Sequence, residues 1–258
     1  MLLQDVDVGL PLGADDVEIG PLKLLRLDRE NAIALVRSSV LLRRSTDIAI
    51  CNAHTILSSI DDPVYAETLQ SMTLLNDGVG ANLASRYLHG CSFPENLNGT
   101  DFIPSLLAEV GIPLRIYLLG AKEEQLQLAR QHIEVTYPLH TVVGARNGYF
   151  KPSDEESICR DISDAKADLL LVAMGNPRQE RFIVQNRNAL NATVSIGVGA
   201  LFDFMSGNVL RAPKAVQALG LEWLFRLLQE PKRLFRRYVI GIPRFMLALR
   251  RLKRERES

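Results

Sequence analysis

The 258-residue sequence predicts an α/β protein: a doubly wound, mostly parallel sheet of a Rossmann-like variant, followed by a basic amphipathic helical appendage. Three observations support this prediction. Short runs of consecutive apolar residues recur along the chain, as is typical of strands covered on both faces. Segments with helix-capping residues separate these runs, so right-handed crossovers between parallel strands are expected. Near Arg211, the balance of charge changes abruptly.

Each expected strand is a continuous apolar run that ends at a turn. The strands are expected at residues 47–51, 72–75, 114–119, 168–173 and 193–198. Helices are expected over 29–44 with Asp28 as the cap, over 101–110 with Thr100 as the cap, and over 154–166, where Ser153 and Glu156 match a capping box.

The net charge of zero is the sum of two unlike parts. Residues 1–210 contain 17 Lys/Arg and 26 Asp/Glu, whereas residues 211–258 contain 13 and 4. We therefore expect an acidic α/β domain over 1–210 and a basic appendage over 211–258 that faces an anionic partner. The apolar content of 47% and the charged content of 23% exclude a disordered, collagen-like or coiled-coil protein.

Cysteine usage and hydropathy indicate the compartment. The three cysteines are widely spaced and no metal-ligand spacing is present, so free thiols in a reducing compartment and no metal are expected. The sequence has neither a secretory signal pattern nor an apolar run of about 18 residues. It predicts a soluble or peripheral cytosolic protein without a cofactor.

Ligands of open α/β sheets bind beyond the carboxyl ends of the strands. The candidate residues there are Asn52, Asp77, Gly78, Gly120, Gly175, Asn176, Pro177 and Gly199. Asp77 precedes a glycine that lets the backbone approach a ligand, and its carboxylate could act as a general base towards a hydroxyl. Alternatively, Asp77 caps the next helix.

Two later motifs offer further polar groups. In 175–180 (GNPRQE), Pro177 fits the first turn of a helix, and Arg178, Gln179 and Glu180 offer donor and acceptor groups beside the site. Gln179 could contact a base or sugar edge; alternatively, the segment is a solvated first helical turn. Asp203 lies between two phenylalanines and pairs either with a substrate or with a structural cation. The four histidines form no recognisable constellation, so structural or surface roles are expected for them.

Residues 221–258 interleave aromatic and aliphatic side chains with Lys and Arg, and Pro231 and Pro243 are expected to divide them into short helices. Such segments are typical of a membrane interface, and an anionic bilayer is the favoured partner. Packing on the α/β core or an oligomer contact is the first alternative. Nucleic acid is the second, although no nucleic-acid-binding motif accompanies the charge.

In their order along the chain, the motifs resemble those of the WecG/TagA/CpsF family of bacterial glycosyltransferases. The matching segments cover about residues 30–240. They include NDGVG at 76–80, GTD at 99–101, YLLGA at 117–121, VAMGNPRQE at 172–180, GVGALFDFMSG at 197–207, RAP at 211–213 and GLEWLFR at 220–226.

The resemblance implies inverting, metal-independent transfer of a hexose, N-acetylhexosamine or uronic-acid-type sugar from a UDP-sugar to a polyprenyl-diphosphate-linked glycan. The implied process is exopolysaccharide or cell-wall polymer synthesis at the cytoplasmic face of the bacterial inner membrane, without nucleic acid. Asp77 inherits the role of base and Gln179 that of a donor-site contact. The resemblance places Thr100 and Asp101 in the substrate site, and assigns Arg211, Arg226 and Arg233 to its completion from the appendage.

Two positions depart from the family pattern. Only Asn52 remains of a Thr-x-Asn motif, and Asn96 stands where many members carry an arginine. One rival hypothesis is therefore a non-catalytic nucleotide-sugar-binding or assembly protein of the same fold. Another is a soluble nucleotide-binding enzyme that forms a homo-oligomer through its basic appendage.

Overall fold

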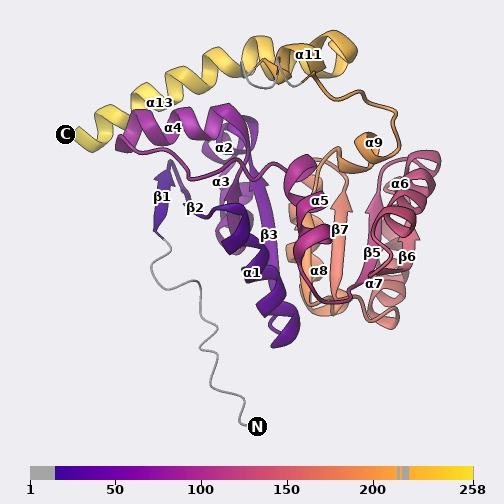
Figure 1. Cartoon of the computed structure of the whole chain (residues 1–258). Helices are drawn as coiled ribbons and strands as arrows, with labels where there is room; N and C mark the ends of the chain where they lie inside the picture. Colours follow the sequence, from indigo (N-terminus) through magenta and orange to yellow (C-terminus); the bar gives the residue numbers. More distant parts are fainter. Residues whose placement is uncertain (1–14, 214–215, 217–220, 258) are drawn as a thin grey trace.

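The computed structural model describes residues 15–213, 216 and 221–257 (Figure 1). In these residues, six parallel strands form one sheet in the order β4-β3-β8-β7-β5-β6. They are β3 (Thr46–Cys51), β4 (Thr73–Asn76), β5 (Arg115–Gly120), β6 (Thr141–Arg146), β7 (Leu169–Ala173) and β8 (Val194–Gly197). The predicted doubly wound α/β fold is confirmed, and this sheet is parallel throughout.

Helices cover both faces of the sheet, which is why the strands are continuously apolar. In β3, Ile48 and Ile50 point into one core, whereas Ala49 and Cys51 point into the other. The first core receives side chains from α1 (Arg29–Leu41), α5 (Gly99–Glu109), α6 (Glu123–Thr136) and α9 (Leu201–Met205). The second receives them from α2 (Ala53–Asp61), α3 (Pro63–Gln70), α4 (Gly78–His89), α7 (Glu155–Asp164) and α8 (Arg178–Leu190).

Two features of the fold lack a strong apolar signal in the sequence. β6 is an edge strand in which Gly144 and Arg146 interrupt the apolar pattern and Val142 is the buried hydrophobic residue. An antiparallel hairpin of β1 (Asp16–Ile19) and β2 (Leu22–Leu25) precedes α1. Its strands are only four residues long, and Val17, Ile19, Leu22 and Leu24 are buried against the second core.

The helix caps agree with the sequence at one position and differ at two. Asp28 caps α1, because its Oδ1 accepts from the amide of Asn31 at 2.8 Å. Thr100 does not cap α5; Asn98 does so by accepting from the amide of Asp101 at 3.0 Å. Ser153 does not cap α7, because it lies within a 3-10 turn, η1 (Pro152–Asp154), that precedes this helix.

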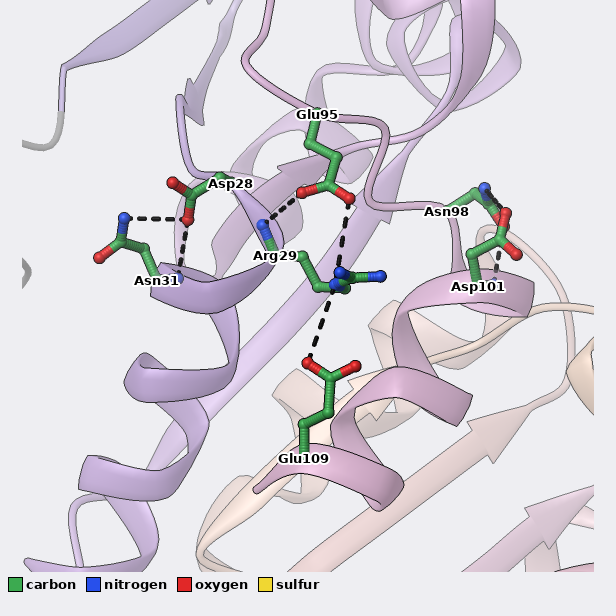
Figure 2. Close-up of polar contacts among 7 residues, drawn as sticks. All are labelled: Asp28, Arg29, Asn31, Glu95, Asn98, Asp101 and Glu109. Carbon is green, nitrogen blue, oxygen red and sulfur yellow. Dashed lines mark hydrogen bonds and ion pairs between the residues drawn. The ribbon is translucent and has the colours of Figure 1, made fainter. Parts of the chain in front are cut away.

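The segment before α5 is fixed by polar contacts with two helices (Figure 2). The amide of Arg29 donates to Glu95 Oε2 at 2.9 Å, and the Nε of Arg29 lies 4.0 Å from Glu95 Oε1 and 3.9 Å from Glu109 Oε2. From the other side, Asn76 Nδ2 donates to the carbonyl of Glu95 at 2.9 Å. These contacts hold the neighbouring Asn96 at the carboxyl end of β4.

The appendage contains α11 (Glu222–Gln229), α12 (Pro231–Phe235), the π-helical η2 (Arg236–Ile240) and α13 (Gly241–Glu257). Pro231 begins a new helix, as expected. Pro243 was expected to break the helix, and this is wrong: η2 continues into α13, and Pro243 falls in the first turn of α13, where proline is tolerated.

The appendage lies across the carboxyl ends of the strands, where Figure 1 shows α11 and α13. α13 packs against α2 and α4, and its Phe245 and Leu249 are buried in the second core. Arg244 of α13 pairs with Asp61 at the end of α2 at 3.0 Å. The core-packing alternative therefore holds for one face of α13.

We predict that Arg187→Met lowers the free energy of unfolding by about 2–3 kcal/mol, because it leaves the buried Asp47 without its cation. Burial raises the pKa of Asp47, and the positive charge of Arg187 opposes this rise. Without Arg187, Asp47 takes up a proton more readily, so the loss of unfolding free energy should be smaller at pH 5 than at pH 8. Urea denaturation measures both values. Arg130→Met, which breaks the exposed pair with Glu134, is the control and should cost less than about 0.5 kcal/mol. Equal losses would contradict the prediction.

Candidate active site

A cavity of about 1180 Å³ lies at the carboxyl ends of β3, β4, β7 and β8. Turns of the α/β domain form its floor, and the appendage supplies one wall. The appendage residues in this wall are Glu222, Trp223, Arg226, Glu230, Leu234, Arg237, Tyr238, Gly241, Ile242, Phe245 and Met246. The cavity is therefore closed by the same segment that holds the excess of positive charge.

Asp77 lies on the floor of the cavity, and its carboxylate does not cap a helix. It occupies the N-cap position of α4 but makes no capping hydrogen bond. The first amide of α4, that of Gly78, instead donates to Asn96 Oδ1 at 2.7 Å. The capping alternative for the Asp77 side chain is therefore wrong.

Asn52 orients this carboxylate. Its Nδ2 donates to Asp77 Oδ2 at 3.2 Å, while its Oδ1 accepts from the amides of His54 and Thr55 at 3.0 and 3.2 Å. Because the oxygen caps α2, the amide group cannot rotate away from Asp77. Asn52 thus joins the first turn of one helix to the carboxylate at the start of the next.

The surroundings of Asp77 favour its action as a proton acceptor. Burial raises the pKa of Asp77, and the hydrogen bond from Asn52 and the positive charges of Arg237 and Arg226 oppose this rise. A carboxylate with a raised pKa holds a transferred proton more firmly than an exposed one, which suits a general base.

Two arginines of the appendage offer donors to the cavity. The guanidinium of Arg226 lies over the ring of Phe204, with 4.9 Å between its Cζ and the ring centroid. Within the described part of the chain, the buried Nε atoms of Arg226 and Arg237 have no hydrogen-bond partner. Burial raises the pKa of the nearby Glu222, and Arg211 opposes this rise. Arg226 also lies 3.9 Å from Glu230 Oε2, and guanidinium groups that line a cavity can bind an anionic ligand.

Gln179 and Glu180 are buried, so the solvated-turn alternative is wrong for both. Gln179 Oε1 accepts from the amides of Gly175 and Gly199, each at 3.1 Å, and its Nε2 donates to Glu180 Oε1 at 2.7 Å. Glu180 is fully buried and lies behind the cavity wall rather than in it. Pro177 is at the N-cap position of α8, not in the first turn as expected, and lines a separate small hollow.

The structure brings most of the expected site residues together. Those that line the cavity are Asn52, Asp77, Gly78, Thr100, Gly175, Asn176, Gln179, Gly199, Asp203 and Arg226. Gly120, Pro177 and Glu180 do not line it, and Asp101 and Arg211 form an ion pair outside the lining. Asp101 also accepts from Asn98 Nδ2 at 2.8 Å (Figure 2). The side chain of Arg233 is outside the described part of the structure.

Sequence reasoning missed several cavity residues. His54 lines the cavity from the first turn of α2, although a structural or surface role was expected. Burial lowers its pKa to about 4, and the positive charge of Arg237 acts in the same direction. Its position two residues after Asn52 was the available signal. Glu222 and Trp223 lie in the GLEWLFR segment at 220–226, which was the available signal for both, whereas nothing in the sequence separated Arg237 from its neighbours.

Within residues 15–213, 216 and 221–257, no three His, Cys, Asp or Glu side chains are grouped in a way that could hold a metal ion. Within the same residues, no helix combines the length and the hydropathy that crossing a bilayer requires.

The fold and the site are those of an α/β enzyme whose cavity is lined by both carboxylate and guanidinium groups. The model of the Glycosyl transferase WecG/TagA/CpsF family matches residues 17–258, and the chain belongs to this family of glycosyltransferases. It is 33% identical over 213 residues to the N-acetylglucosaminyldiphosphoundecaprenol N-acetyl-beta-D-mannosaminyltransferase of Bacillus subtilis (strain 168). The match covers 82% of this chain and 80% of the relative.

We predict that His54→Gln reduces the loss of stability at acid pH. The pKa of His54 is about 4 in the folded chain and about 6.5 when unfolded, so between these values the unfolded state binds a proton that the folded state does not. The wild type should therefore lose more free energy of unfolding than the variant between pH 7 and 4.5. Urea denaturation at the two pH values measures this difference; equal losses in the two proteins would contradict it.

Proposed function

We propose that this glycosyltransferase moves an N-acetylhexosamine from a UDP-sugar to a hydroxyl of a polyprenyl-diphosphate-linked glycan, in the synthesis of a cell-wall or exopolysaccharide polymer. The observation that carries the proposal is the position of the Asp77 carboxylate on the cavity floor. Asn52 orients this carboxylate, and it makes no helix-capping hydrogen bond. The name of the Bacillus subtilis relative supports an N-acetylated amino sugar and a diphosphate-linked lipid acceptor.

The proposed reaction is a single displacement without a metal. Asp77 takes the proton of the acceptor hydroxyl, whose oxygen forms a bond to the anomeric carbon of the donor sugar. The bond between that carbon and the diphosphate oxygen breaks, and UDP leaves with the electron pair. Attack on the face opposite the leaving group inverts the anomeric configuration. Arg226 and Arg237 are placed to stabilise the charge that develops on the diphosphate.

These arginines offer positive charge that the Asn96 position lacks. Asn96 accepts from the first amide of α4, and the appendage contributes Arg226 and Arg237 to the cavity, beside Lys122 and Arg178 of the α/β part. Arg211 is paired with Asp101 outside the cavity lining, whereas Arg226 and Arg237 line the cavity, which makes these two the better candidates for the diphosphate. Arg233 stays a candidate from the family resemblance.

We also propose that the appendage binds the cytoplasmic face of the membrane peripherally. One face of it packs on the protein through Leu234, Phe245 and Leu249. Other apolar side chains remain exposed, among them Leu228 (74%), Phe235 (55%) and Leu247 (63%). Exposed cations flank them at Lys232, Arg236, Arg244, Arg250 and Arg251. Exposed apolar and basic side chains on one segment are typical of helices that lie in an anionic membrane interface.

We predict that Asp77→Asn lowers kcat by about 10²–10⁴-fold, because the amide cannot take the proton. The assay measures UDP release from UDP-N-acetylhexosamines with lipid-diphosphate-sugar acceptors, with a chelator present. UDP-sugar binding should persist. Asp164→Asn, at the exposed end of α7, is the control and should keep full activity. Full activity of Asp77→Asn would overturn the mechanism, and nucleotide binding without turnover by the wild type would favour the non-catalytic hypothesis.

We predict that replacing Leu228, Phe235 and Leu247 with serine reduces flotation with anionic vesicles, because it removes apolar contact with the bilayer. The wild type should float with phosphatidylglycerol-containing vesicles, and less so at high salt. The matched control replaces Leu128, Val135 and Leu139 with serine. These residues lie in or just after α6, and their exposed fractions are 42%, 75% and 54%. Failure of the wild type to float, or equal loss in both triple variants, would contradict membrane binding through the appendage.

A further inference from the structure

The turns after β7 and β8 meet on one side-chain atom. Gly175 and Gly199 follow these strands, and both have positive φ angles, of 77° and 58°. Both also line the cavity. Their amides point at Gln179 Oε1 at 3.1 Å each, so one oxygen determines the distance between the two turns. A displacement of this oxygen would therefore affect the hydrogen bonds of both turns.

Glu180 determines which way the Gln179 amide faces. A flipped amide would present its NH2 group to the two glycine N–H groups and lose both hydrogen bonds. In the observed orientation, Gln179 Nε2 donates a hydrogen bond to Glu180 Oε1 at 2.7 Å. An apolar residue at position 180 would leave this buried N–H unpaired, at a cost comparable to the bonds that hold the turns.

The rest of the network holds Glu180 in place. Asn176 Nδ2 donates to Oε1 at 2.7 Å, and the hydroxyl of Tyr65 lies 3.1 Å from Oε2. These partners and Gln179 are neutral, and burial raises the pKa of Glu180. What Gln179 requires from position 180 is therefore an acceptor oxygen at this point, and a glutamine side chain can supply one, because the hydroxyl of Tyr65 can either donate or accept.

We propose that Glu180 is a positioning residue for the nucleotide donor. It acts through Gln179 to hold the glycine turns after β7 and β8 at the separation that the donor requires. The assignment of the donor as a UDP-sugar rests on the proposed function, whereas the coupling of Glu180 to the two turns does not. The appendage residues that line the cavity lie outside this network.

The test is a double-substitution cycle on the full chain at pH 8. Glu180→Leu removes the acceptor, and Gln179→Glu places a second carboxylate against Glu180. Each should raise the Kd for UDP and the donor KM by about tenfold, with the acceptor KM changed less. Glu180→Gln keeps an acceptor and should stay within about threefold of the wild type. Gln179→Glu combined with Glu180→Gln restores a donor–acceptor pair and should recover most of the affinity that Gln179→Glu loses.

Amide hydrogen exchange of Gly175 and Gly199, followed by NMR without ligand, gives a readout that does not depend on activity. Exchange at both glycines should accelerate in Glu180→Leu and Gln179→Glu and slow again in the double variant, while thermal unfolding reports the integrity of the fold. Additive losses, or unchanged exchange in Glu180→Leu, would overturn the positioning role. The expected exchange pattern without sugar transfer would overturn the proposed function alone, and the same pattern without UDP binding would overturn the assignment of the donor.

Discussion

The active end of the sheet depends on the close approach of α8 to β8 at Gly197. A Cβ on Gly197 would lie 2.7 Å from Gln179 Nε2 and 3.2 Å from Glu180 Oε1, so only glycine allows the two side chains to lie there. This approach lets one amide oxygen reach the turns after β7 and β8. The shape of the cavity floor is thus set by the absence of a side chain in the last residue of a buried strand.

Strand register places the reacting group in the same direct way. Cys51 of β3 pairs with Asn76 of β4, and the amide of Asp77 donates to the carbonyl of Cys51 at 2.9 Å. The next residue of each strand therefore emerges side by side, which puts the amide of Asn52 against the carboxylate of Asp77. In parallel strands both chains leave the sheet at the same edge, so the pairing needs no additional loop to bring the two residues together.

The sequence predicted what depends on local pattern. Strands buried on both faces show as continuous apolar runs, so β3, β4, β5, β7 and β8 were found, whereas the edge strand β6 was missed. The sequence could not show that the Asp77 side chain does not cap α4. The group that accepts from the amide of Gly78 is Asn96, which lies 18 residues further along the chain. The burial of Glu180 was equally hidden: polar residues in the first turn of a helix are usually solvated, and here Tyr65, a partner 115 residues away, satisfies the carboxylate.

In the fold, the basic appendage faces both the cavity and the solvent. Along α13, Phe245 and Leu249 are four residues apart and share the face that packs on α2 and α4, so Leu247 between them points away from the core. The preceding π-helical segment places Arg237 at the cavity, while Arg236 is exposed. One segment therefore both closes the site and presents a basic, apolar surface. In the proposed reaction, docking this surface on a bilayer brings the cavity beside a lipid-linked acceptor, because the residues proposed to bind the membrane and those that line the cavity belong to the same helices.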